Sequence, residues 1–345
     1  MSTRSLPPEL LVAIADGGGL VRATDCRRLG VSQDRIDRLL RNGRLVALAK
    51  GVYAAGTEIA GLRGWPLFEL QSRAFVIASP SDTYASDWSA VALHGMPTKA
   101  CPPQVPSVIR LGSRASGSNL TVHGRTRFAS VPDRWLTDVK GVRTVRPAFT
   151  AIDIGRGCDR RMGLMLADAT AARDGSRESL AQALQDMAAW PRIKHARWAA
   201  INADPDVELA LESAGRFAFF RVGLAPSQSN VWVGDGFPRY RLDHYWSECR
   251  LAAEADGLGK YHLSDPVEAM RREKEREWHL QEWGIRVVRY TWQVALAKPD
   301  ALANRCATMM RAEPLPASRT VQTWPRLVGF QMLGITPPFG RSSGP

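Results

Sequence analysis

One stretch, residues 239–262, constrains the fold more than any other because it sets acidic residues inside the pattern of two strands. Residues 240–245 and 250–256 each alternate in side-chain character with the period of two that a strand requires. The residues between them predict a tight turn. Alternation across the resulting hairpin lets Asp243 and Glu254 meet.

Two carboxylates near the ends of paired strands repel each other, so a fold that keeps both ionised usually neutralises them with a cation. Magnesium prefers oxygen ligands and is typically held by one or two carboxylates together with substrate phosphate. Asp243 and Glu254 therefore predict a divalent-metal site that orients or deprotonates a water beside a phosphodiester. Asp256, Lys260 and His262 follow closely and offer further acidic and basic groups. The alternative is a surface hairpin whose acids are solvated.

Five segments, in a fixed order, carry a resemblance to a known group of enzymes. They are Glu208–Ser213, Arg241–Asp243, Ala253–Gly257 with Lys260–His262, Arg271–Trp278 and Trp283–Trp292. Together they resemble the small nuclease-like domain related to very-short-patch-repair endonucleases, a branch of the PD-(D/E)XK superfamily. The likeness spans roughly residues 204 to 300, an ordinary domain length.

This resemblance implies a three-layer nuclease domain that hydrolyses DNA with Mg²⁺ or Mn²⁺. Glu212 on the first helix, Asp243 and Glu254 would be the metal ligands. Glu208 would lie one turn before Glu212 on the same helix face.

The chain departs from the family pattern at one position. A lysine usually stands two residues after the second acid, and here Asp256 stands there. Lys260 or His262 would then transfer a proton or position the water. The predicted catalytic set is Asp243, Glu254, Asp256, Lys260 and His262.

A basic helix is predicted near the N-terminus, over residues 33–42. Ser32 can cap its start and Gly43 its end. Ile36, Leu39 and Leu40 would face inward, whereas arginines at spacings of three would project outward. Two helices precede this one and a two-stranded wing turning at residues 50–51 follows it. The order of these elements predicts a winged helix-turn-helix.

This unit resembles the N-terminal winged helix of AbiEi-type antitoxins. The matching segments are Gly19–Arg22, Leu29–Ser32, Gly43–Val46 and Gly51–Tyr53. The residues that would meet DNA by this resemblance are Arg35, Arg38, Arg41, Arg44 and Lys50. Arginine can read guanine bidentately or grip phosphate, and the sequence leaves both open. A solvated basic face is the alternative.

The middle of the chain predicts mixed structure with weaker chemistry. Helices are expected over residues 64–78, 82–95, 147–153, 163–172 and 180–187, and short strands over 105–111, 120–123 and 142–145. The segments 86–95 and 145–153 also resemble the middle of AbiEi-like proteins. Asp87, His94 and Asp153 are interpreted as structural residues.

Composition indicates an ordinary globular protein, and its net charge favours binding to a polyanion. The 345 residues include 45% hydrophobic and 23% charged, and the formal net charge is +12. Positive potential favours nucleic acid. We find neither a membrane-spanning apolar run nor an apolar signal region, so a cytoplasmic location is expected. The five cysteines are too scattered for a Cys-x-x-Cys zinc pair, which favours reduced thiols.

The sequence thus predicts four regions in an α/β (α+β) chain. They are a winged helix at 1–58, an α+β middle domain at 59–203, a PD-(D/E)XK-like domain at 204–312 and a poorly ordered tail at 313–345. The predicted function is a DNA-binding, metal-dependent endonuclease. The alternative is a transcriptional regulator or antitoxin-like protein whose nuclease fold is inactive. A protein partner or self-association stays open.

Overall fold

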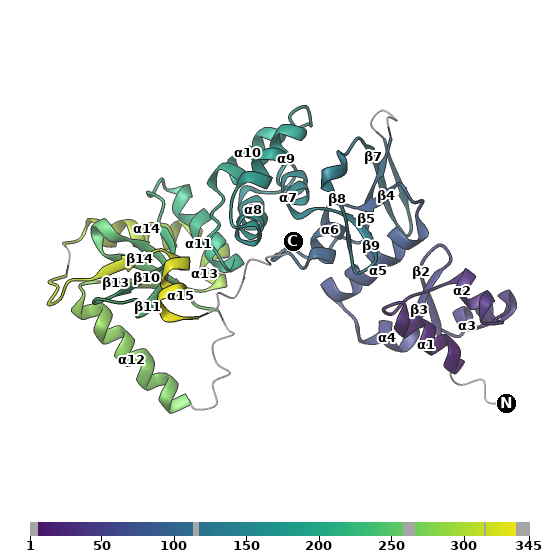
Figure 1. The fold of residues 1–345 in the computed structure, drawn as a ribbon, viewed down its shortest axis with the longest axis horizontal. Helices are drawn as coiled ribbons and strands as arrows, with labels where there is room; N and C mark the ends of the chain where they lie inside the picture. The colour runs from purple at the N-terminus through teal and green to yellow at the C-terminus, as the bar shows by residue number, and fades with distance from the viewer. Residues whose placement is uncertain (1–5, 113–116, 258–265, 314, 336–345) are drawn as a thin grey trace. The chain divides into compact units, whose positions relative to one another are not determined.

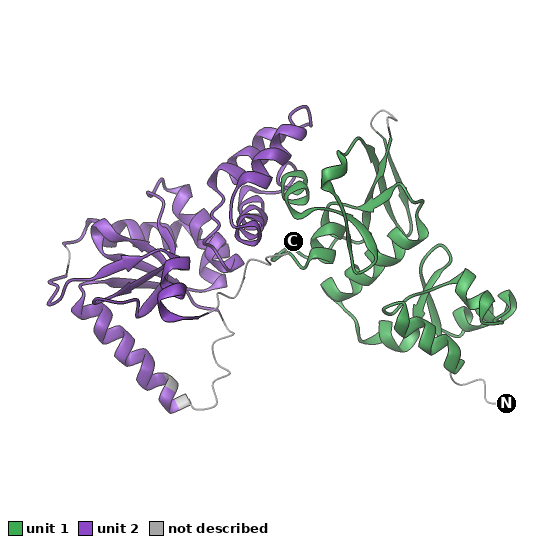
Figure 2. Ribbon diagram, viewed as in Figure 1, with its two compact units in different colours: residues 1–154 green, residues 155–345 purple. Residues whose placement is uncertain are grey.

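The computed structural model describes residues 6–112, 117–257, 266–313 and 315–335. The chain divides into two compact units, residues 1–154 and residues 155–345 (Figures 1 and 2). Both units combine helices with mixed sheets, so the predicted α/β class is confirmed.

Unit 1 begins with the arrangement of a winged helix. Its elements are α1 (Pro8–Asp16), β1 (Val21–Arg22), α2 (Ala23–Arg28), α3 (Gln33–Arg41), β2 (Leu45–Ala49) and β3 (Val52–Ala55). The strands form an antiparallel sheet in the order β1-β3-β2. Leu10, Ile14, Cys26 and Ile36 are fully buried in one core, because each helix has its apolar residues on one face.

The rest of unit 1 is built on a six-stranded sheet in the order β6-β7-β5-β4-β9-β8. Its elements are α4 (Gly56–Gly61), α5 (Gly64–Ala78), β4 (Thr83–Ala85), α6 (Trp88–His94), β5 (Ser107–Leu111), β6 (Ser118–Thr121), β7 (Gly124–Ala129), β8 (Leu136–Val139), β9 (Val142–Val145) and α7 (Pro147–Gly155). The single helix expected over residues 82–95 is wrong. Strand β4 and helix α6 occupy it, and Asp87 between them has a φ of 57°, which a continuous helix excludes.

Unit 2 places helices before and around a five-stranded sheet. Its elements are α8 (Arg160–Asp174), α9 (Glu178–Asp186), α10 (Ile193–Asn202), α11 (Ala210–Arg221), β10 (Gln228–Gly234), β11 (Tyr240–Trp246), β12 (Leu251–Ala255), α12 (Pro266–Glu282), β13 (Arg286–Tyr290), α13 (Trp292–Ala297), α14 (Pro299–Arg311), β14 (Gln322–Trp324) and α15 (Arg326–Leu333). The strand order is β13-β12-β11-β10-β14, and only the β12–β13 pair is parallel among these strands.

The predicted hairpin is confirmed as β11 and β12. Tyr245 lies opposite Ala252, and a 3₁₀ turn over Ser247–Cys249 joins the strands. The side chains of Leu242, Tyr245 and Trp283 share one buried core with strand β10.

The division between the units lies inside the region expected as one middle domain. Helices α8 to α10 belong with the sheet that carries Asp243, rather than with the sheet of unit 1. Arg216 of α11 donates to Asp168 of α8 at 2.5 Å, and both side chains are buried. This pair joins residues 48 positions apart, a separation that local sequence patterns do not report.

The expectation of a poorly ordered tail from residue 313 needs correction. Strand β14 pairs with β10, and α15 packs on the same strand. The rings of Trp232 and Phe330 meet edge to face with centroids 5.4 Å apart. Arg326 is 4% exposed and donates through Nε to a Glu208 carboxylate oxygen at 2.7 Å. Apolar contacts and one buried charge therefore order this segment despite its proline and glycine content.

We predict that Gly329→Ala loosens the C-terminal segment. A Cβ at this position would overlap the Trp232 ring, so α15 must shift or the ring must turn. The expected cost is about 1–3 kcal/mol, measured by thermal unfolding together with faster proteolysis after β14. Val328→Ala is the matched control, because Val328 is 40% exposed. Equal proteolysis of the two variants and the wild type would show that α15 does not depend on this contact.

Candidate functional site

Helix α3 presents the basic surface that the sequence predicts. The Ser32 side chain accepts a hydrogen bond from the Arg35 backbone N–H at 3.4 Å and caps the helix start. Ile36 and Leu39 are buried. Arg35, Arg38 and Arg41 are exposed, as expected from their spacing.

The wing is a short hairpin held against the second helix. Strands β2 and β3 turn at Lys50 and Gly51, and the Ala23 N–H donates to the Gly51 carbonyl at 2.8 Å. Gly51 has a φ of 68°, a conformation that glycine adopts without strain. Lys50 is exposed at the tip, whereas Arg44 is half-buried at the base.

The three predicted metal-binding acids all belong to unit 2. Asp243 accepts a hydrogen bond from the Ala255 backbone N–H at 2.7 Å, so its carboxylate bridges β11 to β12 next to Glu254. Burial, followed by the nearby Asp243, Glu212 and Glu254 carboxylates, raises the pKa of Tyr290 well above its ordinary value. All three carboxylates therefore contribute to the raised pKa of the Tyr290 hydroxyl.

Glu254 is neutralised by a side chain that the sequence prediction did not assign to the site. Arg276 of α12 donates to Glu254 Oε2 at 2.7 Å, and Glu254 is 4% exposed. The other carboxylate oxygen of Glu254 is buried and accepts no hydrogen bond within the described residues. One oxygen is thus paired with a cation, and the second lacks a donor.

Glu212 is held by neutral donors. One of its carboxylate oxygens accepts from the Glu208 backbone N–H at 2.9 Å and from the Asn230 side-chain amide at 2.7 Å. Burial first, and then the Asp243 carboxylate, raise the pKa of Glu212 above its ordinary value of 4.5.

Glu208 does not lie where the sequence placed it. It precedes α11 rather than lying one turn back along that helix, because the first helical residue is Ala210. Its carboxylate accepts from Arg241 at 2.9 Å and from Arg326 at 2.7 Å. Two arginines thus balance this acid.

Of the remaining predicted catalytic residues, the structure describes only Asp256. Asp256 follows β12, and its backbone N–H donates to the Tyr290 carbonyl at 2.7 Å. Lys260 and His262 lie outside the described residues.

No group of three His, Cys, Asp or Glu side chains within the described ranges is close enough to share a metal ion. The physical reason is that the acids are drawn to different donors, Glu254 to Arg276 and Glu212 to Asn230. Asn230 Oδ1 and one Glu254 oxygen are each a buried acceptor without a donor in the described part of the chain, so each could accept a cation, although the acids as placed do not share one. A metal would require Glu254 to leave Arg276.

A neutral histidine lies behind the acids. Burial, with a smaller effect from Arg216, lowers the pKa of His244 to about 3, so the imidazole is uncharged at neutral pH. Its Nε2 lies 2.7 Å from the Tyr290 hydroxyl. Tyr290 fits against α11 only because residue 215 is glycine, where a Cβ would overlap the phenol.

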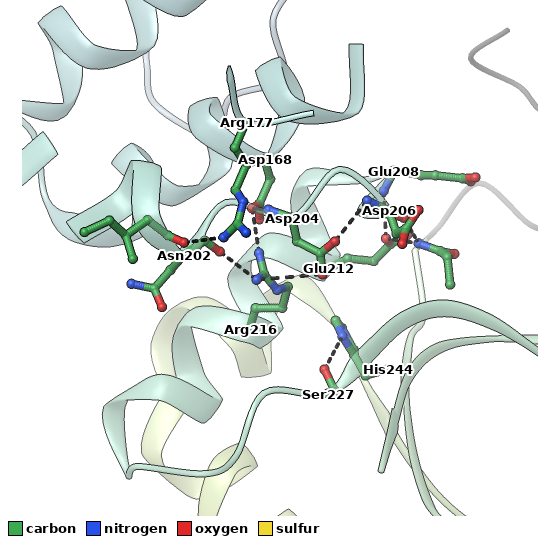
Figure 3. Close-up of polar contacts among 12 residues, drawn as sticks. Asp168, Arg177, Asn202, Asp204, Asp206, Glu208, Glu212, Arg216, Ser227 and His244 are labelled. Atoms are coloured by element: carbon green, nitrogen blue, oxygen red, sulfur yellow. Dashed lines mark hydrogen bonds and ion pairs between the residues drawn. The ribbon is translucent and has the colours of Figure 1, made fainter. Parts of the chain in front are cut away.

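A groove of about 770 Å³ opens beside these residues, between α9, the end of α10 and α11. Arg216 and Asn202 are among its lining residues, and Figure 3 shows the Arg216 side chain reaching toward both Asp168 and Asn202. Arg216 donates to the Asn202 carbonyl at 2.7 Å. Burial raises the pKa of Asp168 to about 6 although Arg216 opposes the shift. The groove's buried polar groups are therefore engaged in holding helices together.

Comparison with known proteins bears on the N-terminal unit. Residues 9–56 match the family described as "Transcriptional regulator, AbiEi antitoxin". The segment that matches, called the AbiEi-like segment below, coincides with the winged helix α1 to β3. The described helices include none with the length and hydropathy needed to cross a membrane.

Two uncharacterized proteins of Mycobacterium tuberculosis resemble most of the chain, one from strain CDC 1551 / Oshkosh and one from strain H37Rv. Each is 28% identical over 283 residues, which cover 80% of this chain and 96% of the relative. This similarity therefore extends well beyond the AbiEi-like segment at residues 9–56.

We predict that Glu212→Gln gains stability over the wild type as the pH rises from about 5 to about 8. The folded-state pKa of Glu212 lies above 4.5. Ionisation therefore opposes folding, and the wild type loses stability as the pH rises above that value. Glutamine keeps an acceptor for the Glu208 N–H and does not ionise.

The expected gain is about 1–3 kcal/mol at the upper pH, measured by denaturant unfolding across the pH range. Glu178→Gln is the matched control, because Glu178 is an exposed acid of α9. A pH-independent difference between Glu212→Gln and wild type would contradict the shifted pKa.

Proposed function

We propose that this protein is a DNA-binding transcriptional regulator of the AbiEi antitoxin type. The observation that carries the proposal is the capped helix α3, whose Arg35 and Arg38 side chains are exposed and make no hydrogen bond or ion pair within the described residues. An unpaired guanidinium on a helix of a winged-helix module suits phosphate or a base edge. The family match of residues 9–56 and the net charge of +12 support the same proposal.

In this proposal the acids of unit 2 are structural. Arginines balance Glu208 and Glu254, and neutral donors hold Glu212. A buried carboxylate paired in this way needs no further cation to be tolerated. Unit 2 would then present a partner-binding or self-association surface, and antitoxin action would come through a protein partner.

We predict that Arg41→Ala weakens DNA binding and lowers the slope of log affinity against log salt by about one. The expected loss is uniform across duplex sequences, because a phosphate contact carries no sequence information. Gel retardation of short duplexes at several salt concentrations measures both effects. Arg173→Ala is the matched control, because Arg173 is an exposed arginine of α8 in the other unit. A wild-type chain that retards no duplex at low salt would contradict the regulator.

We also propose a second candidate function, metal-dependent hydrolysis of DNA. The observation that favours it is the Asp243 carboxylate, which lies near Glu212 and is hydrogen-bonded next to Glu254, together with the buried Glu254 oxygen that lacks a donor in the described part of the chain. Magnesium or manganese, held by these three acids, would supply positive charge at a phosphodiester. Asp243 would orient the site through its bond to β12, and proton transfer is assigned by sequence to Lys260 or His262.

A plasmid assay separates the two proposals. Supercoiled DNA is incubated with the protein in Mg²⁺, Mn²⁺ or EDTA, beside the Asp243→Asn variant. The regulator predicts retarded but uncut DNA and no metal-dependent gain in Tm. The hydrolase predicts metal-dependent nicking that Asp243→Asn abolishes while DNA binding persists. Nicking that survives in the variant would exclude this acid cluster as its source.

A further inference from the structure

The rotation of α3 decides which of its side chains face outward. Ile36 and Leu39 point into the core, at 0% and 8% exposure. At about 3.6 residues per turn, the opposite face carries Asp34, Arg38 and Arg41. Arg35 falls on the flank beside Leu39. Arg38 and Asp34 are thus central to the exposed face, one turn apart.

The hydrogen bonds of α3 separate its charged residues further. Gln33 donates to the Asp37 carboxylate at 2.9 Å, and Arg41 Nε donates to the Asp37 carbonyl at 3.4 Å. Asp34 and Arg38 make no side-chain hydrogen bond or ion pair within the ranges the structure describes, although their spacing allows one. Both therefore remain available to a ligand.

The wing leaves base reading to α3. Its turn has two residues, and the bond from Ala23 to Gly51 holds the tip against the start of α2. Lys50 is the basic side chain at this tip, and a single cation held there suits a phosphate.

The negative charge of Asp34 favours contact of the N-terminal part of α3 with DNA bases rather than with phosphates. A carboxylate is repelled by phosphates, so the face of α3 that carries Asp34 is disfavoured against the DNA backbone, whereas Arg35 lies on the flank of the helix. In the major groove a G·C pair offers the guanine N7 and O6 acceptors and the cytosine N4 donor. Arg38 supplies the donors for guanine, and Asp34 supplies the acceptor for cytosine.

We propose that Arg38 and Asp34 read a G·C base pair in the major groove, whereas Arg35, Arg41, Arg44 and Lys50 grip phosphates. This inference rests on the proposed DNA-binding function and assigns its base specificity. Arg38 alone could contact either a phosphate or a guanine. The neighbouring Asp34 carboxylate, which phosphates repel, favours the guanine.

The test starts by selecting bound duplexes from a random library with the full chain. Affinity is then measured by fluorescence anisotropy on the enriched duplex and on copies in which single guanines are replaced by 7-deazaguanine, which lacks the N7 acceptor. We expect one replacement to weaken wild-type binding about tenfold to a hundredfold. Arg38→Ala should lose a similar factor on unmodified DNA and lose nothing more on the replaced duplex. Asp34→Ala should lose the preference for cytosine at the paired position.

Arg35→Ala is the matched control, an exposed arginine of the same helix. It should weaken binding to all duplexes alike and keep the sensitivity to 7-deazaguanine. Binding without a G·C requirement, or an Arg38→Ala variant that still senses the replacement, would overturn the readout while leaving DNA binding intact. A chain that binds no duplex would overturn the proposed function as well.

Discussion

The cost of burying carboxylates organises unit 2. A buried charge is tolerated only when it is paired and hydrogen-bonded, so each acid requires a partner from elsewhere in the chain. Asp168 on α8 takes Arg216 on α11, and Glu254 on β12 takes Arg276 on α12. Each pair ties a helix to another element at a fixed point. Removing one partner would leave an uncompensated charge inside the unit.

Glu212 is the exception to this pattern. Burial, followed by the nearby Asp243 carboxylate, raises the pKa of Glu212, and the neutral donors that hold it oppose this shift only in part. The Glu212 carboxylate is therefore not neutralised by an ion pair within the described residues. In the proposed regulator a proton on Glu212 would neutralise it, and in the proposed hydrolase a divalent cation would do so. The two proposed functions differ in how this one carboxylate group is neutralised. His244 and Tyr290 behind it stay uncharged at neutral pH and act as a rigid support.

The winged helix follows the opposite rule. Its arginines are left exposed on α3, and the core of Leu10, Ile14 and Ile36 involves no buried ion pair within the described residues of that module. Unpaired surface cations add little to stability. Their arrangement around Asp34 instead suits the proposed binding of duplex DNA, which offers anionic phosphates and base edges with hydrogen-bond donors and acceptors. The chain thus combines a winged-helix module whose described core buries no ion pair with a second unit that balances buried charges inside.

Local pattern determined much of this protein. The period of α3, its Ser32 cap, the wing turn at Lys50–Gly51 and the β11–β12 hairpin all depend on residues a few positions apart, and the structure confirms them. Tertiary structure alone decided which charges pair, because Arg326 lies 118 positions from Glu208. It also ordered the C-terminal segment, where proline and glycine predicted a loose tail, since packing on Trp232 and a buried charge outweigh weak local propensity. The positions of the acids and arginines along the chain follow from the sequence, whereas the partner that neutralises each acid follows only from the fold.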